Sequence, residues 1–149
     1  MRRIDVSKAY RLMELEPVVL VTTTRGGNDN VMTMGLHMVV QHSPPLLGGV
    51  ILPWGRSYEA LVETGECVIA IPGPDLAEKV VEIGNCSGAD VDRFERFGLG
   101  RAAPTVVSAP LIADCLANLE CRVFDTSLIE HYNLFILEVV AISCNGHPS

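Results

Sequence analysis

Aromatic residues are scarce in this sequence, at 5% of its 149 residues, and no apolar run approaches the roughly 20 residues that a membrane-spanning helix needs. The first residues, MRRIDVSKAY, also lack the apolar segment of a signal peptide. The lack of a membrane-spanning run and the lack of a signal peptide argue against a membrane or secreted protein. We therefore expect a cytoplasmic protein.

Clustered basic residues are equally scarce. The chain carries 11 lysines and arginines against 18 aspartates and glutamates, which gives a formal net charge of −7. Nucleic acids and anionic membrane surfaces are bound by clusters of Lys and Arg. The charge therefore argues against nucleic acid and membrane partners.

The sequence has no C-x-x-C motif, P-loop, G-x-G-x-x-G or G-x-S-x-G. Its five cysteines are odd in number, and its four histidines lack the spacing of zinc ligands. We expect buried, reduced thiols and no metal site. Cys86, in the glycine-rich loop 84–90, is the cysteine for which exposure and a thiol role stay open.

The chain does contain many short β-branched and apolar segments separated by turn residues. Strands are expected at 18–24, 31–41, 46–52, 66–71, 114–124 and 132–144, with a hairpin turn at 26–29. Short helices are expected at 5–15, 58–63, 75–83 and 91–97. Ser57 would cap the second helix, and Asp75 with Glu78 would form a capping box on the third.

Direct turns between strands interrupt any alternation of strands and helices, which excludes a doubly wound sheet. A closed or partly open antiparallel barrel is the simplest solution, because closure protects the edges of apolar strands. The length suits one domain, and we expect residues 1–149 to form it.

Two segments carry candidate binding groups. Asn30–Met34 offers small polar and backbone groups beside thioethers, which suit the plane of a flat heterocycle. Trp54–Tyr58 offers an arginine and two hydroxyls at an expected helix start, which suit a phosphate. Taken in isolation, an ordinary strand and an ordinary solvated helix start remain the favoured interpretations.

The segments taken in order resemble the flavin reductase-like, FMN-binding split-barrel family, and more narrowly its flavoredoxin branch. The matching stretches are PVVLVTT (17–23), NVMTMG (30–35), SPPLLGGVI (43–51), RSYEALVETGECVIAIP (56–72), GNCSGADVDRFERFGL (84–99), APLIADCLANLECRV (109–123) and EHYNLFILEVV (130–140).

This resemblance implies a mainly β fold, an antiparallel Greek-key split β-barrel with short flanking helices. It implies FMN as the cofactor and a homodimer with FMN at the subunit interface, for which the 48% apolar fraction leaves surface. Electrons would pass from NADH, NADPH or a small-molecule or protein redox partner through FMN to an acceptor. A non-catalytic FMN-binding electron carrier or flavin-binding module is the alternative, and a barrel that has lost flavin is a third.

The resemblance also implies the cofactor-binding residues. They are Asn30, Val31, Met32 and Thr33 at the flavin ring, Ile51, Leu52 and Pro53 beneath the ring and ribityl chain, Arg56, Ser57 and Tyr58 at the phosphate, and Ser87, Arg93 and His131. Arg93 stands where the family often has lysine, near the phosphate or ribityl end. His131 would lie near the flavin edge or nicotinamide site and orient the donor, as the sole catalytic candidate.

Three features depart from the family pattern. Leu36 replaces a bulky aromatic against the ring, and Leu137 replaces a small glycine. The sequence stops at Ser149, where relatives continue for some tens of residues that help to cover the flavin. We therefore expect weaker retention of the cofactor.

Overall fold

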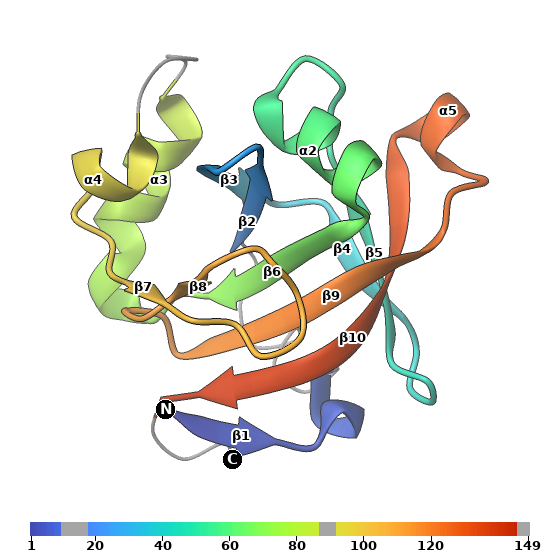
Figure 1. Ribbon diagram of the computed structural model, residues 1–149, viewed down its shortest axis with the longest axis horizontal. Helices are drawn as coiled ribbons and strands as arrows, with labels where there is room; N and C mark the ends of the chain where they lie inside the picture. Colours follow the sequence, from blue (N-terminus) through green and yellow to red (C-terminus); the bar gives the residue numbers. More distant parts are fainter. Residues whose placement is uncertain (10–17, 87–91, 146–149) are drawn as a thin grey trace.

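The computed structural model describes residues 1–9, 18–86 and 92–145 (Figure 1). The strands are β1 Arg2–Ile4, β2 Val19–Arg25, β3 Asn28–Met34, β4 His37–Gln41, β5 Leu46–Val50, β6 Glu66–Ile71, β7 Arg101–Ala102, β8 Leu111–Ile112, β9 Ala117–Asp125 and β10 Leu134–Cys144. The helices are α2 Arg56–Thr64, α3 Ala77–Asn85, α4 Arg93–Arg96 and α5 Ile129–Tyr132, with 3-10 turns at Val6–Lys8 and Pro74–Leu76. The predicted mainly β fold with short helices is confirmed.

Antiparallel pairing joins eight of these strands in the order β3-β2-β6-β9-β10-β5-β4, with β1 added along β10 (Figure 1). The long strand β10 pairs with β9 on one edge, and with β5 and then β1 on the other. The end strands β3 and β4 follow one another in the chain but are not neighbours in the sheet. The sheet is therefore open between them.

Side chains of the sheet alternate between two apolar layers, as the two-residue period of a strand dictates. Val21 points into the main core, where Leu61 of α2 meets Leu119 and Phe135. Its neighbour Leu20 points to the opposite face, into a second cluster. That second cluster lies where α3 and α4 pack on β3, so these helices are held beside the open edge of the sheet.

Several local predictions are wrong. The expected strand 31–41 is two strands, because the pairing breaks at Gly35 and Leu36. Ser57 is not the N-cap of α2: Gly55 holds that position, and Ser57 lies within the first turn. The capping box of Asp75 and Glu78 does not form, since Leu76 precedes α3 and no side chain caps it.

Other local predictions are confirmed or lie outside the described residues. Gly65 ends α2 in the left-handed region at φ 70°, as expected of a helix-ending glycine. Asp5 accepts a hydrogen bond from the Ser7 amide at 2.9 Å, while most of the helix predicted to follow lies outside the described residues. Leu137 is fully buried in the main core. In the described part of the chain, no helix has the length and apolarity to cross a membrane.

Candidate functional site

A cavity of about 440 Å³ lies between β3, the start of α2 and the end of α3, beside the open edge of the sheet. Its walls include many of the predicted cofactor-binding residues, namely Asn30, Met32, Thr33, Ile51, Leu52, Arg56, Ser57, Tyr58 and Arg93. The fold therefore brings the two candidate segments of the sequence to one place.

The other predicted residues are placed differently. The Val31 side chain is buried in the second cluster, and its carbonyl faces Arg93. Pro53 and His131 do not line the cavity. His131 is exposed on α5, with its ring 6.2 Å from that of Tyr132. Ser87 lies outside the described residues.

A buried hydrogen bond joins the two segments. The Asn30 side-chain amide donates to the Ser57 hydroxyl at 2.8 Å. Asn30 is 8% exposed and Ser57 1%, so this contact is shielded from water. The amides of the first turn of α2 have no capping side chain, because the residue before the helix is Gly55. Such a helix start can bind an anion.

Arg93 is fixed by its two terminal nitrogens. One donates to the Val31 carbonyl at 2.9 Å, and the other donates to the Cys86 carbonyl at 3.0 Å. The third nitrogen, Nε, is buried and has no hydrogen-bond partner among the described residues. Because buried N–H groups are nearly always paired, this Nε is available to an acceptor brought by a ligand.

The remaining wall of the cavity is apolar within and exposed at the rim. Met34, Ile51 and Ile83 are buried, at 1–2% exposure. Leu36 and Trp54 form part of the rim and are 70% and 81% exposed. Among the described residues that line this cavity, none is a carboxylate or a histidine. The buried apolar part of these walls suits the face of a planar ligand.

Some lining residues were missed by sequence reasoning, chiefly Ile83 and Gly84 at the end of α3. A Cβ on Gly84 would lie 3.2 Å from the Thr33 hydroxyl, so a glycine lets α3 approach β3 closely. A glycine near the end of a predicted helix was therefore the signal available in the sequence.

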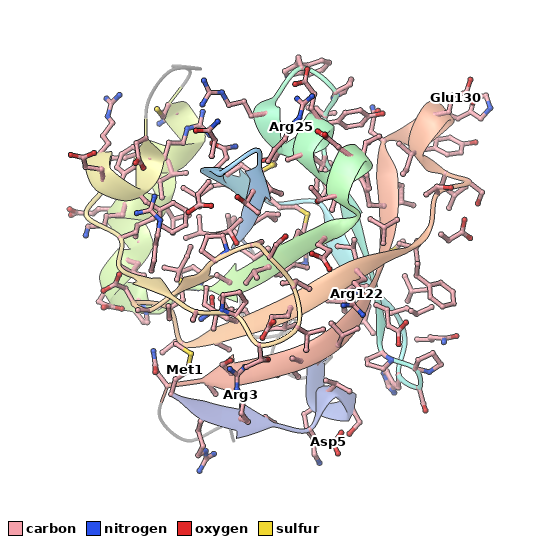
Figure 2. The ribbon with its side chains drawn as sticks, viewed as in Figure 1. Met1, Arg3, Asp5, Arg25, Arg122 and Glu130 are labelled. Carbon is pink, nitrogen blue, oxygen red and sulfur yellow. The ribbon has the colours of Figure 1, made fainter. Side chains whose placement is uncertain are left out.

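A second, more polar cavity of about 530 Å³ shares Asn30 and Arg56 with the first. Charged side chains of both signs line it: Arg25, Arg56, Arg101, Asp29, Glu59 and Asp92. Figure 2 shows Arg25 beside α2, where its guanidinium lies 2.9 Å from Glu59. The two cavities together follow the start of α2 from an apolar to a charged region.

An open antiparallel barrel with a cavity beside its open edge is the architecture of the flavin reductase-like split-barrel proteins. The predicted split barrel is confirmed by a close structural match. That match is an FMN-binding domain of a flavin reductase-like enzyme from Shewanella baltica, with a TM-score of 0.87 and 28% identity over 94% of this chain and 74% of that one. Residues 14–149 match the model of the flavin reductase like domain, and the chain belongs to this family.

Two further comparisons agree with this assignment. The flavoredoxin of Desulfovibrio vulgaris has a TM-score of 0.80 and 25% identity, over 87% of this chain and 69% of that one. An uncharacterized protein of Archaeoglobus fulgidus is 33% identical over 114 residues, which are 76% of this chain. The chain spans 64% of the length of that archaeal relative.

Proposed function

We propose that the first cavity binds FMN, and that the protein passes electrons from NADH, NADPH or a redox partner through FMN to an acceptor. The observation that carries the proposal is the meeting of Arg56 and buried Ser57, at an uncapped helix start, with the unpartnered Nε of Arg93 in one apolar-walled cavity. Each of these groups matches a part of the cofactor.

The phosphate fits the start of α2. Arg56 supplies a cation there, Ser57 supplies a hydroxyl, and the first-turn amides of α2 supply N–H donors that no side chain caps. Charge-assisted hydrogen bonds of this kind contribute about 1.5–3 kcal/mol each. Arg93 would donate its Nε to the ribityl or phosphate end, since its other nitrogens already hold backbone carbonyls.

The flavin ring fits the apolar part of the cavity. Met32 and Ile51 offer apolar surface, while Asn30 and Thr33 offer polar groups. When bound, FMN supplies the redox chemistry itself. The chain's own residues bind the cofactor, orient it and keep water from its buried face. Among the described residues that line the cavity, no carboxylate or histidine is placed to move a proton.

We further propose that a second subunit covers the rim. Leu36, Leu52 and Trp54 are exposed apolar side chains at the mouth of the cavity, and such patches mark interaction surfaces. His131 lies outside the cavity of its own chain, so a role in orienting the donor would require the site of the other subunit. A molar mass of two chains by light scattering supports this assembly, and a monomer with bound FMN contradicts it.

A non-catalytic electron carrier is the second candidate function. It is favoured by the similarity to a flavoredoxin and by the lack of a carboxylate or histidine among the described residues that line the cavity. Both candidates need FMN but differ in whether a nicotinamide donor turns over.

The deciding experiment begins with the purified protein and added FMN. A flavin spectrum retained after gel filtration supports both candidates, and failure to take up FMN contradicts both. Oxidation of NADH or NADPH in the presence of FMN is then measured at 340 nm under steady-state conditions. Turnover supports the reductase, whereas bound FMN without turnover with either donor supports the carrier.

A further inference from the structure

We propose that a third cavity binds a small, uncharged molecule with an apolar body, and that its occupancy is linked to FMN binding through Tyr58. This cavity has a volume of about 490 Å³ and lies between α2 and α5, beside the adjoining ends of β9 and β10. The link rests on the proposed function, because it needs FMN in the first cavity. The binding site itself does not depend on that proposal.

The walls of the third cavity are mainly apolar. Leu61 of α2 and Phe135 of β10 line it and are 0% exposed, since both belong to the main core. Val123 and Ile129 also line it, and these half-buried side chains pack against the same core. The volume falls within the roughly 300–1,000 Å³ of ordinary small-molecule sites. A ligand here would therefore gain its binding energy mainly by covering apolar surface.

The charges at the cavity determine which ligands fit. Glu130, on α5 (Figure 2), is the single charged residue among the described residues that line it, and these include no Lys, Arg or His. An anion would lose its hydration against apolar walls, and no cation in the lining offsets that cost. Because Glu130 is exposed, an ion pair with it would contribute little to the binding of a cation. The cavity therefore favours an uncharged ligand, unlike the two arginine-lined cavities at the start of α2.

Tyr58 connects the third cavity to the first, because it lines both. Its ring stands edge-on to that of Phe135, with the centroids 5.5 Å apart and an interplanar angle of 80°. A molecule in the third cavity would pack on Tyr58 and hold it in the position from which it meets FMN. Each ligand would thereby reduce the entropy that the other loses in ordering Tyr58, and linkage makes this effect reciprocal.

The site is tested by calorimetric titration of the FMN-loaded protein with benzyl alcohol and with benzoate, which are similar in size but differ in charge. We expect saturable binding of benzyl alcohol. We expect binding of benzoate to be weaker by about tenfold or more, because its carboxylate loses hydration. No binding of benzyl alcohol, or benzoate binding that is equally tight, would overturn the proposal.

Two variants that fill the cavity, one from each helix, test where the ligand binds. Val62→Trp on α2 and Ile129→Phe on α5 should each weaken benzyl alcohol binding by about tenfold or more, since the larger side chains take up its space. Val81→Trp on α3 is the matched control and should bind normally. Val62 and Val81 are exposed helical valines, at 56% and 62%, but Val81 lies outside the cavity. Unchanged binding in Val62→Trp and Ile129→Phe would overturn the proposal.

The link is tested by fluorescence titration of FMN with and without saturating benzyl alcohol. We expect benzyl alcohol to lower the dissociation constant of FMN about fivefold, an effect that Val81→Trp should keep and Val62→Trp should lose. A dissociation constant that stays the same or rises would overturn the link.

Failure of the proposed function shows separately, as a protein that does not bind FMN. Such a protein would still bind benzyl alcohol, and Val62→Trp would still weaken that binding. A protein that binds FMN but not benzyl alcohol would instead contradict the third cavity as a site and leave the proposed function intact. The two failures are therefore distinguishable.

Discussion

The side-chain amide of Asn30 on β3 donates a 2.8 Å hydrogen bond to the hydroxyl of Ser57 in the first turn of α2. Both side chains are buried, so the contact fixes the helix start against the strand. In the proposed FMN site, the strand would contact the flavin ring and the helix start would bind the phosphate. This one bond therefore sets the spacing between the two halves of the proposed FMN site.

The first prediction concerns the phosphate end. The double change Arg56→Ala/Ser57→Ala should weaken FMN binding tenfold or more, because each charge-assisted hydrogen bond contributes about 1.5–3 kcal/mol. Fluorescence titration of FMN measures the dissociation constant. Arg122→Ala, remote from the cavity on β9, is the control and should bind FMN normally. An unchanged dissociation constant in the double variant would show that the phosphate binds elsewhere.

A second prediction concerns Arg93→Lys. A lysine cannot replace the guanidinium in donating to both the Val31 and Cys86 carbonyls, and it has no Nε donor. We expect a loss of about 1–3 kcal/mol in the free energy of unfolding, together with weaker FMN binding. Urea unfolding and FMN titration measure the two effects. Arg96→Lys, on the same short helix, is the control. Full stability and full affinity in Arg93→Lys would contradict the role given to this residue.

The succession of strands could be predicted because β-branched runs and turn residues encode it locally. Gly26 and Gly27 adopt positive φ at 57° and 81°, as the predicted hairpin turn requires. The site residues came from the resemblance, since the patterns at Asn30–Met34 and Trp54–Tyr58 are common in ordinary strands and helix starts.

Other features could not be predicted because they depend on tertiary packing. Ser57 was expected to cap a helix, yet its hydroxyl accepts a bond from Asn30, which lies 27 residues earlier in the chain. Ile83 and Gly84 joined the cavity only because α3 packs on β3. Apart from the glycine at position 84, no local pattern in the sequence points to these long-range contacts.

A third prediction concerns Glu120, a fully buried carboxylate on β9. It accepts hydrogen bonds from the amides of Thr105, Val106 and Val107 at 2.7–3.1 Å, and the guanidinium of Arg3 lies 3.2 Å away. Burial by itself raises the pKa of Glu120, but these hydrogen bonds outweigh it, so its pKa lies below the usual 4.5. The carboxylate thus anchors a loop to the sheet.

Because the folded state lowers this pKa, its stabilisation is present above the unfolded value and is lost as the pH falls below 4.5. Glu120→Gln should cost about 1–3 kcal/mol of unfolding free energy at neutral pH, since an amide replaces a charged acceptor. The difference from the unchanged protein should shrink as the pH falls below 4.5. Urea unfolding at several pH values measures it, with exposed Glu130→Gln as the control. A pH-independent difference would contradict this account.

The fourth prediction uses the cysteines as a probe of the FMN cavity. Cys86 is half-buried and lines the cavity, whereas the other four, Cys67, Cys115, Cys121 and Cys144, are buried. Burial also raises the pKa of the Cys115 thiol to about 12, which suppresses its reactive thiolate. A disulfide reagent such as DTNB should therefore modify Cys86 first in the native protein, and saturating FMN should slow that reaction because the cofactor covers the thiol.

Cys86→Ser should abolish the fast reaction, and Cys115→Ser should leave it unchanged. If FMN binds but leaves the rate at Cys86 unaltered, the cofactor lies outside this cavity.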